Sequence, residues 1–197
     1  MKIALYGATG MVGREIRAEA ARRGHTVTAV TRSGSGGTLV ANLADTATFR
    51  RLAVENDAVV IAIPPDRTGK PHEPYVAAFD ALLAAEPRAR LLLVAGAGSL
   101  VVDGTALVDQ PGFPEAYKAE ARSMARVLEK FRAAPAAIDW TAISPAPAIA
   151  PSLRTGVYHE ALDTPAGRSI STQDFAVAVL DELETPKHRR RRFTVAN

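Results

Sequence analysis

The sequence contains no cysteine, which excludes disulfides, thiolate metal ligands and cysteine nucleophiles. It has no apolar run approaching the roughly 20 residues that cross a bilayer, and no basic leader followed by a long apolar run. None of the four histidines has a second histidine or a carboxylate at metal-ligand spacing. We therefore expect a cytoplasmic protein with no metal site and no membrane association.

The excess of positive charge is small, and much of it lies in one run near the end of the chain. The formal net charge is +3, and the run KHRRRR occupies Lys187–Arg192. A basic run can indicate nucleic-acid binding, but this one leads into a strand-like segment and has no interleaved aromatic residue. The pattern favours a solvated basic edge and no nucleic-acid partner. The length of 197 residues and ordinary composition favour one domain spanning residues 1–197.

The most informative stretch is KIALYGATGMVG at Lys2–Gly13. An apolar, strand-like segment ends at Tyr6, and three glycines spaced G-x-x-G-x-x-G lead into a segment of helical period. A strand, a glycine turn and a helix N-terminus bind pyrophosphate, because unpaired N–H groups and the positive end of the helix dipole face the anion. We expect Gly7 to allow the turn, Gly10 to admit the phosphates, and Gly13 to allow close helix packing.

The end of the second predicted strand, His25–Thr31, indicates which dinucleotide binds. NAD-selective folds carry a carboxylate here for the ribose 2′-OH. This chain has Thr31, Arg32 and Ser33 instead, with no acid before Asp45. A guanidinium and a hydroxyl suit a 2′-phosphate, although an exposed loop arginine without a ligand is the alternative. The sequence predicts NADP(H), with NAD(H) as the weaker candidate.

Strand-like and helical segments alternate along the rest of the chain. Further strands are predicted at Thr38–Ala41, Asp57–Ile63, Arg90–Ala95, Ile138–Ser144 and Arg192–Val195, and further helices at Thr46–Val54, Tyr75–Ala85, Glu115–Ala133 and Ser171–Glu184. This alternation predicts an α/β fold with a doubly wound parallel sheet. Residues 103–115 and 148–169 are rich in proline and glycine and are expected to be irregular. We expect 148–169 to form a substrate-side insertion.

Four motifs together resemble one protein family. They are GATGMVG at 7–13, TRS at 31–33, VAGAGSL at 94–100 and DWTAISPA at 139–146. They resemble the atypical short-chain dehydrogenase/reductases, and most nearly the small NmrA-like NAD(P)-binding reductases that include flavin/biliverdin reductase-like proteins. The closing stretch at 170–195 is also similar to theirs. The resemblance implies a Rossmann fold with strand order 3-2-1-4-5-6-7 and NADP(H) across the carboxyl edge of the sheet.

The resemblance also implies which positions contact the cofactor. They are Gly7, Thr9, Gly10, Met11, Val12 and Gly13 at the diphosphate, Arg32 and Ser33 at the 2′-phosphate, Asn42 and Leu43 at adenine, Ile63 and Pro64 at the adenosine ribose, and Pro145 and Ala146 at the nicotinamide. Asn42 stands where the family has an acid. Its side-chain carbonyl can still accept a hydrogen bond from the adenine amino group.

The catalytic residues are less clearly indicated. The resembled family uses a serine together with Tyr-x-x-x-Lys on the helix after the fifth strand, a spacing that brings both side chains to one face. Here Lys118 follows Tyr117 directly, so the two side chains point about 100° apart on a helix. Ser99, Tyr117 and Lys118 are the candidate catalytic residues, although Ala97 could instead occupy the serine position. The alternative, non-catalytic roles are a turn hydroxyl for Ser99, a packing phenol for Tyr117 and a solvated ammonium group for Lys118.

The sequence predicts an NADP(H)-dependent oxidoreductase that transfers hydride to a small ring or carbonyl substrate, such as a flavin or a quinone. Solvent can supply the proton for such a ring, so the protein need only stack substrate on cofactor. A non-catalytic NADP(H)-binding redox-sensing regulator stays open, as does an isomerase or dehydratase for one specialised biosynthetic substrate. The expected partner is a small-molecule substrate, and a homodimer stays open. We expect the substrate between the loops at 66–74, 100–114 and 148–169, which leave the carboxyl ends of strands.

Overall fold

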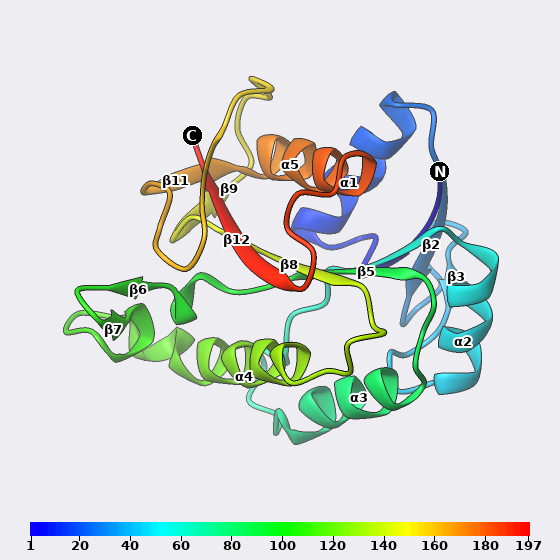
Figure 1. Ribbon diagram of the computed structural model, residues 1–197, viewed down its shortest axis with the longest axis horizontal. Coiled ribbons are helices and arrows are strands. Elements are labelled where there is room, and N and C mark those ends of the chain that lie inside the picture. Colours follow the sequence, from blue (N-terminus) through cyan, green and yellow to red (C-terminus); the bar gives the residue numbers. More distant parts are fainter.

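The computed structural model describes residues 1–197 and has helices on both faces of a central eight-stranded sheet (Figure 1). The strands of this sheet are β1 (Lys2–Tyr6), β2 (Thr26–Thr31), β3 (Leu39–Val40), β4 (Ala58–Ile61), β5 (Arg90–Val94), β8 (Trp140–Pro145), β10 (His159–Ala161) and β12 (Arg191–Ala196). The helices are α1 (Met11–Arg22), α2 (Thr46–Glu55), α3 (Glu73–Ala84), α4 (Glu115–Arg132) and α5 (Thr172–Glu184). Two short ladders lie outside it: β6 (Val101–Val102) with β7 (Thr105–Ala106), and β9 (Ala148–Ala150) with β11 (Ser169–Ser171).

The strand order is β3-β2-β1-β4-β5-β8-β12-β10. The pairs up to β12 are all parallel, which confirms the predicted order 3-2-1-4-5-6-7 and the doubly wound fold. The last strand, β10, pairs antiparallel with β12 and arises inside the segment 148–169, which was expected to be irregular. The expectation that residues 103–115 are irregular was also wrong in part, because this segment contributes β7 and a short 3₁₀ turn before α4.

The sheet separates two hydrophobic cores. One contains Phe49, Phe79, Phe131 and Trp140 and lies beneath α2, α3 and α4. The other lies beneath α1 and α5 and contains Ile16, Phe175, Val179 and Phe193, among others. Every residue of β4 is buried, as expected for a parallel strand covered on both faces. Trp140 is 1% exposed and lies in the first of these cores.

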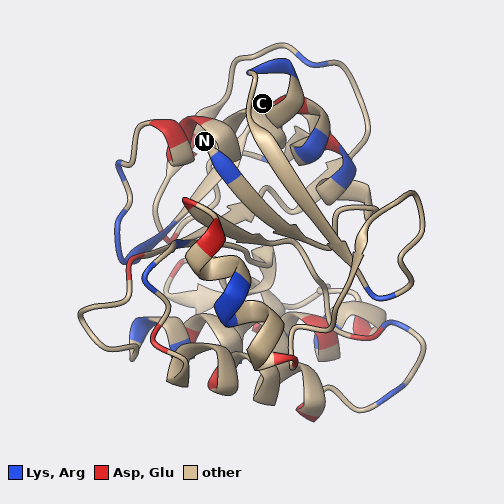
Figure 2. Cartoon of the chain, turned by 90° about the vertical axis from the view of Figure 1, so that its right-hand side faces the viewer, with Lys and Arg blue, Asp and Glu red and all other residues tan.

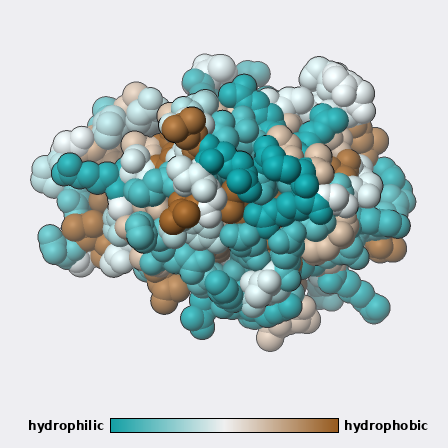
Figure 3. All heavy atoms as spheres, turned by 90° about the horizontal axis from the view of Figure 1, so that it is seen from above, coloured by the Kyte–Doolittle hydropathy of each residue, from teal (hydrophilic) through white to brown (hydrophobic).

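Charged residues of both signs lie mainly on the helices and loops, whereas most of the strand surface carries none (Figure 2). Seen from the side of α1 and α5, exposed hydrophobic residues form small separate patches (Figure 3). None of the helices combines the length and the apolar character that a membrane span requires.

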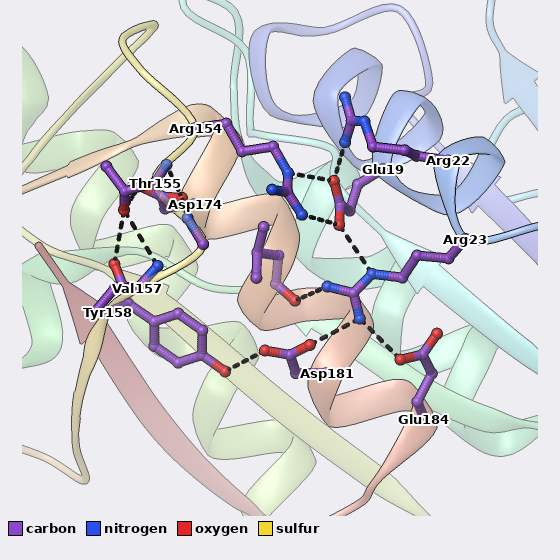
Figure 4. A network of polar contacts seen from close by, with 12 residues as sticks. Glu19, Arg22, Arg23, Arg154, Thr155, Val157, Tyr158, Asp174, Asp181 and Glu184 are labelled. Carbon is purple, nitrogen blue, oxygen red and sulfur yellow. Dashed lines mark hydrogen bonds and ion pairs between the residues drawn. The ribbon is translucent and has the colours of Figure 1, made fainter.

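A network of charged groups joins α1, α5 and the segment after β9 (Figure 4). Glu19 of α1 is 1% exposed and accepts hydrogen bonds from Arg22, Arg23 and Arg154. Arg23 reaches Asp181 of α5 at 2.7 Å. The pKa of Glu19 is lowered from 4.5 to about 2, and the largest cause is the side-chain hydrogen bond from Arg154. The segment 148–169 is therefore tied to α1, the helix that follows the glycine turn.

The lowered pKa of Glu19 predicts a loss of stability in acid. The folded-state pKa lies below the unfolded one, so this stabilisation is complete above pH 5 and is lost as the pH falls towards 2. When the pH is lowered from about 6 to about 3, protonation of Glu19 should reduce the free energy of unfolding by about 2 kcal/mol. Urea denaturation at both pH values checks this, with Glu19→Gln as the control that removes the titrating group. An equal loss of unfolding free energy in both proteins would contradict it.

Candidate functional site

The glycine turn after β1 is built as the sequence predicts. Gly7 has φ +79°, and a Cβ placed on it would lie 2.3 Å from the carbonyl oxygen of Ala62. A Cβ on Gly13 would lie 2.1 Å from the carbonyl oxygen of Gly7. Real Cβ atoms do not approach backbone oxygens so closely, so both positions require glycine for the fold itself. The turn is closed by the Gly10 N–H, which donates to the Gly7 carbonyl at 3.0 Å.

Gly10 differs from the other two glycines. A Cβ placed there would meet only the Gly7 carbonyl oxygen, at 3.3 Å, and its backbone is extended, with φ −69° and ψ 169°. Thr9, Gly10 and Met11 are exposed, and Val12 is half-buried. The chain around Gly10 thus faces outward at the start of α1, where a ligand can approach the backbone.

The first turn of α1 has the chemistry of an anion site. No side chain caps this helix, and no acidic residue lies in its first turn. By contrast, the Asp45 carboxylate caps α2 and the Ser171 hydroxyl caps α5. The first N–H groups of α1 and the positive end of its dipole are therefore left for a ligand. With the glycine turn before it, this helix start fits the diphosphate of a dinucleotide.

The loop after β2 holds Arg32 free of any ion pair. The Gly34 N–H donates to the Thr31 hydroxyl at 3.0 Å, Thr31 and Thr38 share a 2.6 Å hydrogen bond, and Thr38 donates to the Ser35 carbonyl at 3.0 Å. Arg32 and Ser33 are both exposed, and the Ser33 hydroxyl lies 3.1 Å from that of Ser35. The loop is therefore shaped by threonine hydroxyls, and its guanidinium is left for a ligand.

The two residues predicted at adenine lie in different surroundings. Asn42 is exposed, and its side-chain carbonyl accepts a hydrogen bond from the Ala44 N–H at 3.2 Å. A carbonyl oxygen has two lone pairs, so it can accept a second bond. Leu43 is 3% exposed and belongs to the core beneath α2. Because the Leu43 side chain is buried in this core, only the Leu43 backbone can face a ligand.

The ends of the central strands lie side by side. Tyr6 is in register with Ile61 of β4, and Leu93 of β5 is in register with Ala142 of β8. The residues predicted at the ribose and nicotinamide follow β4 and close β8 at this edge; Ile63 and Pro145 are half-buried, Pro64 is exposed and Ala146 is buried. The structure thus brings the predicted residues of the glycine turn, β4 and β8 to one edge of the sheet.

The residues predicted for proton transfer do not form a relay. Tyr117 is 59% exposed in the first turn of α4. The ammonium of Lys118 lies 2.7 Å from the carboxylate of Glu115 on the same helix. Ser99 ends a short 3₁₀ turn after β5, and its hydroxyl accepts a hydrogen bond from Arg192 at 2.8 Å. Ser99 and Lys118 are therefore bound to different partners, and the exposed Tyr117 hydroxyl makes no hydrogen bond within the protein.

Arg192 corrects the interpretation of the basic run at Lys187–Arg192. This arginine is 3% exposed, so the expectation of a solvated basic edge is wrong at that position. The reason is that β12 lies inside the sheet between β8 and β10, so that every residue of this strand after Arg191 is buried. Arg190 is half-buried, and its guanidinium donates to the carbonyls of three residues after α4, namely Ala134, Pro135 and Ile138.

A further set of contacts fixes the loop after β4, which the sequence analysis placed at the substrate cleft. Arg67 donates two hydrogen bonds to the carboxylate of Glu120 on α4, at 2.7 and 2.6 Å. The ring of His72 lies 2.8 Å from the Ser123 hydroxyl and 2.7 Å from the Asp66 carbonyl. No local sequence signal pairs these residues, because their partners lie on the next helix.

A parallel sheet, a glycine turn at its switch point and an uncapped helix start together define a Rossmann-type dinucleotide-binding protein. The sequence profile of the family described as NAD(P)H-binding matches residues 7–186. The chain is also 39% identical over 216 residues to the uncharacterized protein YwnB of Bacillus subtilis (strain 168), covering 100% of this chain and 99% of that protein. The chain belongs to the NAD(P)H-binding family.

Two solved structures are similar over the whole chain. One is a protein of Burkholderia pseudomallei that is provisionally described as exported, with a TM-score of 0.87, 36% identity and 100% of both chains covered. The other, from Streptococcus pneumoniae TIGR4, is provisionally described as an NADH-flavin reductase, with a TM-score of 0.86, 29% identity, and 100% and 99% of the chains covered. These matches confirm the resemblance to NAD(P)-binding reductase-like proteins. The cytoplasmic location stays a prediction.

Proposed function

We propose that this protein is an NADPH-dependent reductase that transfers hydride to a small ring or carbonyl compound, with a flavin or a quinone as the preferred acceptor. Membership of the NAD(P)H-binding family supports the cofactor class. The similar protein from S. pneumoniae, provisionally described as an NADH-flavin reductase, supports the choice of acceptor. The single observation that carries the proposal is the glycine turn, where an added Cβ on Gly10, unlike one on Gly7 or Gly13, meets no atom closer than 3.3 Å.

In this proposal the chain's own residues bind and orient the cofactor. The backbone N–H groups from Met11 to Gly13 hold the diphosphate, and Arg32 and Ser33 hold the 2′-phosphate. Asn42 and Leu43 lie at adenine, Ile63 and Pro64 at the ribose, and Pro145 and Ala146 at the nicotinamide; Thr9, Met11 and Val12 flank the diphosphate. NADPH supplies the hydride. The residues of α4 move no proton in this scheme, because Lys118 is paired with Glu115.

The choice of NADPH over NADH depends on Arg32. Arg32 is exposed and makes no ion pair within the protein, so no ion pair must break for its guanidinium to bind a phosphate. We expect Arg32→Ala to weaken NADPH binding by roughly ten- to a hundredfold, the effect of losing about 1.5–3 kcal/mol. NADH binding should stay the same. Fluorescence titration of both nucleotides measures this, and equal weakening of both would refute the assignment.

Turnover should depend little on Tyr117. A well-placed general acid supplies a factor of about 10² to 10⁴, but this phenol is 59% exposed and has no lysine on its face of α4. We expect Tyr117→Phe to lower kcat less than tenfold with a flavin or quinone acceptor. Steady-state kinetics at saturating NADPH check this. A thousandfold loss of kcat with unchanged NADPH affinity would show that a proton relay exists.

One observation favours a second candidate, a redox-sensing regulator that binds NADP(H) without turning it over. The separate engagement of Ser99 and Lys118 leaves no assembled proton relay. A regulator and a reductase both require NADPH binding, so binding does not separate them. The separating experiment is NADPH oxidation with a panel of flavins, quinones and aldehydes: acceptor-dependent oxidation supports the reductase, and its absence supports the regulator.

A further inference from the structure

Arg192 is a deeply buried charged group near the proposed substrate side. Its side chain is 1% exposed, although it belongs to a run of basic residues. Burying an unpaired charge is costly, so a guanidinium in this place must satisfy its donors within the protein. It does so with only two residues, Ser99 and Asp163.

These two residues come from two different segments at the proposed substrate side. Ser99 lies in the turn after β5, and Asp163 follows β10 in the segment 148–169. Arg192 donates to the Ser99 hydroxyl at 2.8 Å, to the Ser99 carbonyl at 3.2 Å and to an Asp163 carboxylate oxygen at 2.8 Å. The Val101 N–H adds a backbone bond to the Asp163 carbonyl at 2.8 Å. One guanidinium thus joins the two segments.

The direction of these hydrogen bonds decides what Ser99 can do. A guanidinium has five N–H donors and no acceptor. The Ser99 oxygen therefore accepts from Arg192, and its own proton is not used in that bond. The hydroxyl makes no other hydrogen bond within the protein. Its proton is free to be donated to an oxygen or ring nitrogen of a bound molecule.

We propose that Arg192 is a positioning residue that fixes Ser99 against the segment 148–169 and leaves the Ser99 hydroxyl as a donor to the acceptor substrate. This inference rests on the proposed function, since it needs a substrate with a hydrogen-bond acceptor, such as the ring nitrogens and oxygens of a flavin. Arg192 itself touches neither cofactor nor substrate in this scheme. Its effect passes through Ser99.

Arg192→Met and Arg132→Met form a matched pair of variants. Arg132 donates to the same Asp163 oxygen at 2.8 Å, but its side chain is 40% exposed and makes no hydrogen bond to Ser99. Methionine has a similar length to arginine and fills the buried space without charge. In Arg192→Met, the Asp163 carboxylate keeps Arg132 and is 54% exposed to water, so no buried charge is left unpaired and we expect the variant to fold.

Three measurements test the inference: NADP⁺ affinity, FMN affinity of the NADP⁺-saturated protein by flavin fluorescence, and hydrogen exchange of the Val101 amide. In Arg192→Met we expect FMN binding to weaken about tenfold, the loss of one hydrogen bond that a charged group had aligned. NADP⁺ affinity should stay the same, and Val101 exchange should rise. Arg132→Met should change none of the three. Ser99→Ala should weaken FMN binding similarly, and the double variant with Arg192→Met no further, because the two residues act as one unit.

The contrary results are distinct. Unchanged hydrogen exchange of the Val101 amide in Arg192→Met overturns the inference, because the guanidinium would then not hold the turn after β5 to the segment 148–169. Faster exchange with unchanged FMN affinity also overturns it, because Arg192 would be structural only. If the wild-type protein binds NADPH yet neither binds nor reduces FMN, quinones or aldehydes, the proposed function itself fails, and the inference falls with it. That failure is seen in the wild type alone, before any variant is compared.

Discussion

Gly10→Val is expected to abolish NADPH binding while leaving the protein folded. The backbone of Gly10 is extended, a conformation that valine adopts readily. A Cβ at this position meets only one backbone oxygen, at 3.3 Å, so the apo fold has room for it after a small shift. The added side chain projects where the diphosphate must approach the start of α1. The close backbone contact is then lost together with the helix-terminus hydrogen bonds.

The expected loss in NADPH affinity is at least a hundredfold, which corresponds to about 2.7 kcal/mol. The melting temperature of the apo protein should stay within a few degrees, since a surface substitution without a cavity or buried polar group changes stability by about 0.5 kcal/mol. Titration by intrinsic fluorescence and a thermal melt on the same sample provide both readings. Wild-type affinity in Gly10→Val would show that the diphosphate lies elsewhere.

Gly13→Ala is expected to damage the fold itself. Here a Cβ would lie 2.1 Å from the carbonyl oxygen of Gly7 and 2.8 Å from its carbonyl carbon. Neither partner is a movable side chain, so α1 must shift away from the turn. Overpacking of this kind costs about 1–3 kcal/mol and sometimes more, and Gly13 is buried against backbone atoms, so we expect the upper part of that range or beyond.

Urea denaturation measures this loss, and Gly24→Ala is a useful comparison. Gly24 has φ +75° with nothing within 4 Å of an added Cβ, so its substitution tests backbone strain without a clash. We expect Gly13→Ala to lose clearly more unfolding free energy than Gly24→Ala and to bind NADPH poorly. If Gly13→Ala is as stable as the wild type, the close packing of α1 on the turn is not what the structure implies.

Much of the fold could be predicted from local pattern. The glycine spacing after β1, the apolar run of β4 and the cap at Ser171, which accepts from the Asp174 N–H at 2.9 Å, all act within a few residues. The strand order came from the family resemblance, and the structure has the same order. The edge strand β10 was missed because His159–Ala161 has no strand pattern of its own, and it pairs only because β12 offers a free edge.

The candidate site was likewise predictable only where neighbouring residues in the sequence carry the signal. The glycine turn and the candidate phosphate contact Arg32 could be proposed from the sequence because each depends on neighbouring residues. Arg192 could not, since its partners Ser99 and Asp163 lie 93 and 29 positions away. Glu19 and Arg154 are separated by 135 positions. A buried ion pair between distant residues leaves no local signature, because only the tertiary fold removes the charges from water.

The most direct test of the proposed function is NADPH oxidation by the wild-type protein with a panel of flavins, quinones and aldehydes. The account predicts acceptor-dependent oxidation with a flavin or a quinone, faster with NADPH than with NADH, and absent in Gly10→Val. Tight NADPH binding with no oxidation in the presence of any acceptor would contradict it.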